Sequence, residues 1–205
     1  MSKKYVSNGT ESVRMFKSDF LELFSKVHFT IPLFLYVPVI LYFSYVGFFV
    51  QKIPPLLGLG LLLGGILSWT FTEYILHRFL FHFHPTGKLA KRIHFIFHGV
   101  HHDYPNDVLR LVMPPAVSIP LAFLFYFTFY FLLGPALVSL YFVGFVLGYL
   151  FYDISHYAIH HFNFRNKFWF QLKRHHMLHH YQDDKVGFGV SSKLWDIVFK
   201  TDFKK

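Results

Sequence analysis

Long apolar runs alternate with polar, basic segments along the 205-residue chain. Four of the runs are almost free of charged residues, at 29–50, 55–76, 113–133 and 136–152. A helix of about 20 apolar residues crosses the hydrocarbon core of a bilayer, and 17 can suffice. The pattern therefore predicts four transmembrane helices, arranged as two hairpins that a polar segment joins.

The polar segments are expected to lie outside the bilayer. Residues 1–28 form the first, and apolar residues recur at helical spacing behind Ser18. This spacing favours a short amphipathic helix on the membrane surface. The other two segments, 77–112 and 153–201, are rich in histidine. We treat 29–201 as one membrane domain, preceded by an N-terminal segment on the cytosolic side.

The positions of the basic residues predict the topology. Of 20 Lys and Arg, five lie in 1–28, five in 77–112 and nine after residue 152, while Lys52 lies between the first two runs. Cytoplasmic segments of membrane proteins are enriched in Lys and Arg. Both termini and both His-rich segments are therefore expected in the cytosol, at the endoplasmic reticulum or a bacterial inner membrane. The basic cytosolic face suits contact with anionic lipid headgroups. We therefore expect no nucleic-acid partner.

Composition narrows the chemistry. Hydrophobic residues make up 54% of the chain and charged residues 15%, against about 25% charged residues in soluble domains. The chain has no cysteine, which excludes disulfides, thiolate catalysis, iron–sulfur clusters and Cys-type zinc sites. Any bound metal must therefore be held by His, Asp or Glu.

Ten of the 15 histidines fall into four motifs at the ends of apolar runs. Spacings of three and four place side chains on one helix face, and the second and fourth helices can continue outward to carry two motifs. One metal takes four to six ligands, so ten imidazoles fit two metals. Imidazole suits iron, zinc and copper, and spacing does not choose among them. The ten are His77, His82, His98, His101, His102, His156, His160, His176, His179 and His180.

These features predict an all-α integral membrane protein, in which four transmembrane helices carry a cytosolic His-rich helical cap with a di-metal site. Glu73 lies four residues before the first motif histidine, and Asp153 lies three residues before His156. We predict that each carboxylate accepts the second ring N–H of a coordinated histidine. Tyr149 and Tyr152 precede His156 in the same run and are candidates for lining the entry of an apolar substrate.

The motifs resemble those of the fatty acid hydroxylase superfamily, and within it the fatty acid 2-hydroxylases. The second motif is followed by the run Arg-Leu-Val-Met-Pro-Pro, which also resembles the family. The resemblance extends over about 16–201 and is carried by residues 73–82, 98–115, 152–161, 176–181, 187–192 and 194–199.

The resemblance implies a membrane monooxygenase that hydroxylates C2 of a long-chain fatty acyl group, commonly the N-acyl chain of a sphingolipid such as ceramide. It implies two metal ions held by the ten motif histidines, with iron as the working metal and zinc able to occupy the site in a structure. Molecular oxygen would be the co-substrate and a membrane lipid the substrate.

Many family members carry a cytochrome b5 domain with a His-Pro-Gly-Gly haem motif, which this chain lacks. We therefore expect electrons from a separate donor such as cytochrome b5.

Two alternative functions stay open: a sterol or carotenoid hydroxylase or acyl desaturase of the same superfamily, and a metal transporter. Transporters place ionisable residues near the bilayer midplane. Here Glu73 and Asp153 lie at the ends of runs beside histidines, which disfavours transport.

Overall fold

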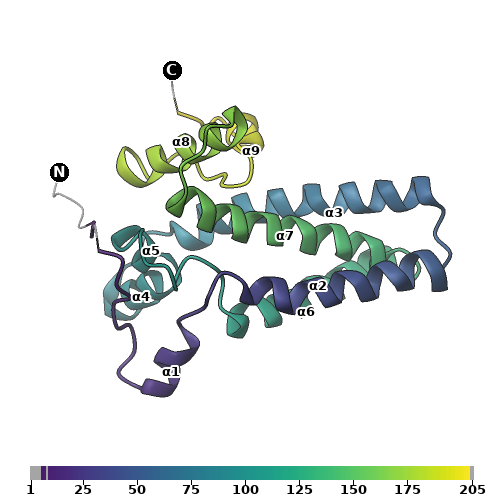
Figure 1. Ribbon diagram of the computed structural model, residues 1–205, viewed down its shortest axis with the longest axis horizontal. Coiled ribbons are helices and arrows are strands. Elements are labelled where there is room, and N and C mark those ends of the chain that lie inside the picture. The colour runs from purple at the N-terminus through teal and green to yellow at the C-terminus, as the bar shows by residue number, and fades with distance from the viewer. Residues whose placement is uncertain (1–5, 8, 204–205) are drawn as a thin grey trace.

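The computed structural model describes residues 6–7 and 9–203, and every regular element within these residues is a helix. Four long helices run side by side, and shorter helices cover one end of them (Figure 1). The predicted all-α architecture is confirmed. The long helices are α2 (Ile31–Tyr45) with its π-helical extension η1 (Val46–Val50), α3 (Pro55–Ile75) with η2 (Leu76–Phe81), α6 (Pro115–Leu133) and α7 (Val138–His161).

Each of the four is long and apolar enough to cross a membrane. Pro55 and Pro115 open α3 and α6, where a missing N–H costs nothing because the first turn has no acceptor for it. Gly134, with a φ of 77°, ends α6, a conformation that glycine adopts without strain. The second and fourth helices extend to Phe81 and His161, so each continues past its apolar run into a His motif.

Helix α7 forms the centre of the bundle and is the most buried of the four. It packs tightly against α3 because glycines remove side chains where the two backbones meet. A Cβ built on Gly144 would lie 2.1 Å from the carbonyl oxygen of Leu62, and one on Gly65 would lie 2.1 Å from that of Tyr141. Small residues permit such close approach between membrane helices.

The outward faces of the other long helices are apolar and exposed, as Phe34 on α2, Leu56 on α3 and Phe131 on α6 illustrate. An apolar surface that surrounds a bundle would be unfavourable in water and suits contact with lipid tails. The protein is therefore an integral membrane protein.

The short helices lie together at one end of the bundle (Figure 1). Helix α1 occupies the predicted position behind Ser18, whose side chain accepts a hydrogen bond from the Leu21 amide. We call the other short helices the cap. The bounds are α1 (Asp19–Phe24), α4 (Gly87–His94), η3 (Phe95–Gly99), α5 (Val100–Asp103), α8 (Lys167–Tyr181) and α9 (Leu194–Val198).

Candidate metal centre

All ten motif histidines converge where the cap meets the ends of α3 and α7, and they divide into two groups of five. In each group, one ligand atom from every ring lies within 4.8 Å of all the others. We call them group A and group B. Group A is His77, His82, His98, His102 and His179, and group B is His101, His156, His160, His176 and His180.

A π-helical turn brings His77 and His82 together. In an α-helix, side chains five residues apart point about 140° away from each other. Here the backbone widens over η2, and the amide of His82 donates to the carbonyl of His77 at 3.1 Å, an i to i+5 hydrogen bond. The two Nε2 atoms consequently lie 3.2 Å apart. Such local widening of a helix is common at functional sites.

Each His-x-x-His-His motif serves both groups. His98 and His102, four residues apart on η3 and α5, belong to group A, whereas His101 between them belongs to group B. Helix α8 reverses the arrangement, since His179 joins group A while its neighbours at 176 and 180 join group B. Both groups thus take some of their histidines from the same cap helices, which fixes the positions of the groups relative to each other.

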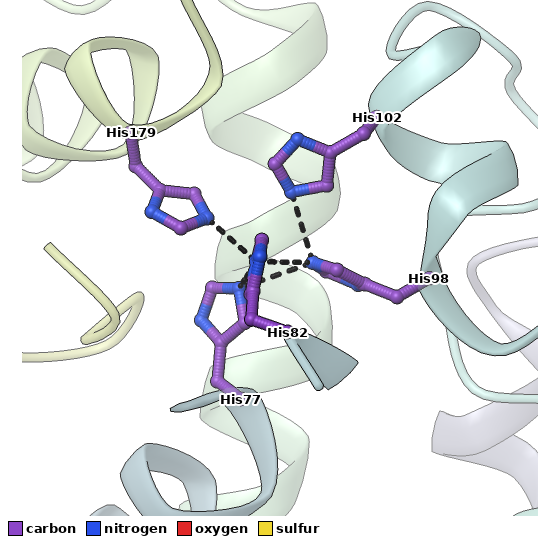
Figure 2. A group of neighbouring side chains, drawn as sticks. All are labelled: His77, His82, His98, His102 and His179. Atoms are coloured by element: carbon purple, nitrogen blue, oxygen red, sulfur yellow. Dashed lines mark hydrogen bonds between the residues drawn. The ribbon is translucent and has the colours of Figure 1, made fainter. Parts of the chain in front are cut away.

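The ring nitrogens of group A present lone pairs to one another. Nδ1 of His77 contacts the carbonyl oxygen of Phe188, and Nδ1 of His179 lies 2.8 Å from that of Val186. A carbonyl only accepts, so these Nδ1 atoms carry the protons and the neutral rings keep a lone pair on Nε2. Those Nε2 atoms point toward the centre of the group (Figure 2), and that of His77 lies 3.1 Å from the Nε2 atom of His98.

The Nε2 atoms of group B also face one another, and hydrogen bonds among them cannot account for their arrangement. Nε2 of His176 lies 3.0 Å from that of His156, 2.9 Å from that of His160 and 2.9 Å from that of His180. One ring nitrogen holds one proton or one lone pair, so it cannot pair with three others. Nitrogens bound to a metal at about 2.1 Å and at right angles lie about 3.0 Å apart. The donor set therefore fits a divalent metal ion.

Burial keeps these imidazoles neutral. For His98, His101, His176 and His180, burial and then repulsion from neighbouring imidazoles hold the pKa well below its usual value. A neutral imidazole is the form that binds metal. The site is consequently ready to bind a cation at neutral pH without first releasing protons.

The structure contradicts the role predicted for Glu73 and Asp153. Glu73 accepts hydrogen bonds from the amides of Val190 and Ser191, at 2.6 and 2.9 Å, and from the Ser191 hydroxyl. Asp153 accepts from the Met113 amide at 3.1 Å. The two carboxylates satisfy backbone amides of loops that lack helical partners. They fix those loops to the helices, and backbone carbonyl groups contact Nδ1 of His77 and His179 instead.

Comparisons with known proteins agree with this architecture. The model of the family described as fatty acid hydroxylase matches residues 62–201. The chain belongs to the fatty acid hydroxylase family.

The relatives of this family member are named for lipid hydroxylation. It is 37% identical to fatty acid 2-hydroxylase of Mus musculus, over 92% of this chain and 56% of the relative. It is also 37% identical to dihydroceramide fatty acyl 2-hydroxylase FAH2 of Arabidopsis thaliana, over 93% of this chain and 80% of the relative. The chain therefore spans about half the length of the mouse protein, 56%.

A solved structure also matches this family member. It is described as full-length scs7p in which only the hydroxylase domain is visible, and the two are similar with a TM-score of 0.85 and 37% identity. The match covers 91% of this chain and 70% of the other. The family fold is thus shown by sequence and by structure alike.

Asp196 on α9 is a functional-site residue that the histidine pattern did not reveal. It is fully buried and accepts hydrogen bonds from the amides of Phe188 and Gly189, at 2.9 and 2.8 Å, and from the Thr201 hydroxyl. Burial would raise its pKa, but hydrogen bonds, first from His175 and then from these groups, lower it. Asp196 therefore shapes the loop whose Phe188 carbonyl contacts His77. In the sequence, Asp196 was marked only by its position in residues 194–199, one of the segments that resemble the fatty acid hydroxylase superfamily.

A cavity of about 590 Å³ adjoins the histidines. Its polar end is formed by Tyr152, Asp153, His156 and two cap histidines, and most of its remaining walls are apolar. Tyr152 lines this cavity, and its contact with a substrate stays a prediction. Tyr149 does not line this cavity; it borders a separate space of about 20 Å³, and its hydroxyl donates to Asp153 at 3.0 Å.

Proposed function

We propose that this chain hydroxylates C2 of a long-chain fatty acyl group, that of a ceramide-type sphingolipid, as a di-iron monooxygenase. One atom of O2 enters the C–H bond and the other leaves as water, with two electrons and two protons from a separate donor such as cytochrome b5. The observation that carries the proposal is the position of two five-histidine groups at the polar end of a large apolar cavity. The names of the relatives support the lipid and the carbon.

The ten histidines are proposed as the metal ligands. Bound iron would supply the reduction of O2, chemistry that zinc lacks because it has no redox states, although zinc fits the same nitrogens. Hydrogen bonds from Nδ1 to the carbonyls of Phe188 and Val186 hold the rings of His77 and His179 with Nε2 inward. Groups contacting the far side of a ligand ring fix its tautomer and orientation.

The cavity is proposed to position the acyl chain. Its volume, about 590 Å³, falls within the range of roughly 300–1,000 Å³ that is usual for ligand pockets. The chain would lie against the apolar walls with C2 beside Tyr152 and His156. Because those walls exclude water, they would protect the reacting centre from competing reactions.

The proposed orientation places the cap and the metal centre in the cytosol, at the endoplasmic reticulum in a eukaryote or the inner membrane in a bacterium. Of the 16 Lys and Arg residues that the structure describes, 15 lie in the segments on the cap side, and Lys52 lies at the opposite end. A cytosolic cap is also accessible to a soluble or membrane-anchored electron donor. The domain proposed to do this work is 29–201.

The test is expression in a host that has cytochrome b5 but lacks 2-hydroxylated sphingolipids, under 18O2, followed by mass spectrometry of the lipids. The expected product carries one 18O at C2 of the N-acyl chain, and the purified protein contains about two metal ions per chain, since ten ligands fill two sites. Replacing His77 or His156 with Ala should abolish the product. A product that has lost two hydrogens, or an oxidised sterol or carotenoid, would contradict the 2-hydroxylase. Metal-dependent flux in liposomes without lipid oxidation would instead indicate a transporter.

A further inference from the structure

The large cavity reaches the protein surface beside α1. Four residues line it and are also half exposed: Leu21 and Phe24 of α1, Leu80 of η2 and Phe97 of η3, with exposed fractions of 50, 51, 49 and 49%. All four are apolar. A mouth that admitted solutes from water would carry polar groups at its rim, so this rim suits an apolar ligand.

The same mouth borders a membrane-spanning helix. Ala116 and Pro120 lie in the first turns of α6, line the cavity and are exposed. Helix α6 is one of the four spanning helices, and most of its other exposed residues, such as Phe123, are apolar. The opening therefore faces sideways, at the level where α6 enters the bilayer.

Helix α1 forms the outer wall of this opening. Phe20 and Leu23 are 69 and 70% exposed and do not line the cavity, whereas Leu21 and Phe24 do. A six-residue helix with apolar side chains on both sides is unsuited to water, and it suits the boundary between headgroups and acyl chains. Basic residues on either side of α1, such as Lys17, suit anionic headgroups.

A buried ion pair holds this wall in place. The side chain of Arg110, 2% exposed, donates to Glu22 at 2.7 Å and to the Val13 carbonyl at 2.5 Å. Glu22 in turn accepts from the amides of Met15 and Phe16, at 2.9 and 3.0 Å. Burial would raise the pKa of Glu22, but those two amides and the Arg110 charge lower it to about 2. The pair is therefore charged at neutral pH.

We propose that α1 is the bilayer-seated outer wall of a lateral entrance through which a lipid acyl chain enters the cavity, and that the Glu22–Arg110 pair fixes this wall. Phe20 and Leu23 contact the bilayer, while Leu21 and Phe24 contact the entering chain. The identity of the chain as an N-acyl group rests on the proposed function, but the entrance itself does not.

The first experiment traps the lipid in the entrance. The whole chain, as purified with its metals and without an electron donor, is placed in phosphatidylcholine nanodiscs. It is irradiated with a ceramide that carries a diazirine in the middle of its acyl chain, and the labelled peptides are sequenced. Label is expected at inner cavity residues such as Val100 and Leu111, which line the cavity and are buried. The chain has no cysteine, so Phe24→Cys can be modified with a bulky apolar maleimide, which should remove the inner label. Lys17→Cys with the same reagent is the control and should keep it.

The second experiment tests the ion pair. Glu22→Gln should increase the rate of amide exchange at Met15 and Phe16 by at least about tenfold, because it removes the charged acceptor of those two amides. It also removes one of the two buried carboxylates that contact Arg110; the other, Asp107 at 3.2 Å, remains. Asp19→Asn is the matched control, because the Arg14–Asp19 pair lies in the same segment but is exposed. Metal content measured on both variants shows whether the rest of the fold is intact.

The outcomes separate this proposal from the proposed function. Inner label that survives the Phe24 adduct, or unchanged amide exchange in Glu22→Gln with normal metal content, would overturn the entrance at α1 even if hydroxylation proceeds. Conversely, loss of the inner label on blocking Phe24 would support the entrance even if no acyl lipid is hydroxylated in the expression host.

Discussion

Replacing Gly144 with Ala should separate α7 from α3. These two helices, with the η2 extension of α3, position four of the ten motif histidines: His77, His82, His156 and His160. The added Cβ would lie 2.1 Å from the carbonyl oxygen of Leu62 and within 3.0 Å of its backbone carbon atoms. A backbone cannot rotate aside as a flexible side chain can. Helix α7 must therefore move away from α3.

The size of the movement follows from the same distances. An ordinary contact begins at 3.4 Å, so the 2.1 Å approach falls short by 1.3 Å. Overpacking of this kind costs about 1–3 kcal/mol, which corresponds to a fall in melting temperature of roughly 2–12 °C for a chain of this size. Metal–ligand distances tolerate only about 0.2 Å. Because α3 leads to His77 and α7 carries His156, we expect the metal content to fall as well.

The assay is thermal unfolding of the purified protein in detergent, together with metal analysis by mass spectrometry. Gly60→Ala is the control on the same helix pair, because a Cβ at Gly60 meets nothing within 4 Å. Gly60→Ala should match the parent protein in both measurements. If Gly144→Ala also matched it, the close approach of α3 and α7 would not control the metal centre, and the reasoning would be refuted.

Three further predictions concern the cap. His98→Ala and His176→Ala should each lower the metal content and abolish product, whereas exposed His84→Ala should do neither; metal analysis and lipid mass spectrometry check both. Asp196→Asn should destabilise the protein by about 2–3 kcal/mol, because charged acceptors form the stronger hydrogen bonds; chemical unfolding measures it. Because the pKa of Asp196 is lowered in the folded protein, its carboxylate stabilises the fold fully above about pH 4. This contribution is lost as the pH falls through the pKa that Asp196 has in the folded state. In Asp196→Asn this component of acid sensitivity should be absent.

The local properties of the chain were enough to predict the helical class and the family. Apolar runs long enough to cross a bilayer are visible without any tertiary information, and α2, α3, α6 and α7 form where they occur. The ten histidines were also recognisable, because motif spacing is a property of neighbouring residues. The structure gathers all ten at one end of the bundle.

The tertiary contacts overturned the predicted partners of the acids. Glu73 and Asp153 were expected to contact coordinating histidines because each lies about one turn away. In the structure the carboxylate of Glu73 contacts Ser191, and that of Asp153 contacts Met113. Buried backbone amides of distant loops compete for the same acceptors, and spacing along one helix contains no information about those loops.

Hydrophobic length and motif spacing predict a helical membrane protein with enough imidazole for two metals, because both properties depend only on nearby residues. The division of the histidines into two groups of five, and the widened helical turn that unites His77 with His82, are visible only in the folded chain. The same is true of the contact by which Arg110 holds α1 against the cavity through Glu22, 88 positions away. Each of these features depends on how distant segments pack, and the free energy of that packing is not a property of any single segment.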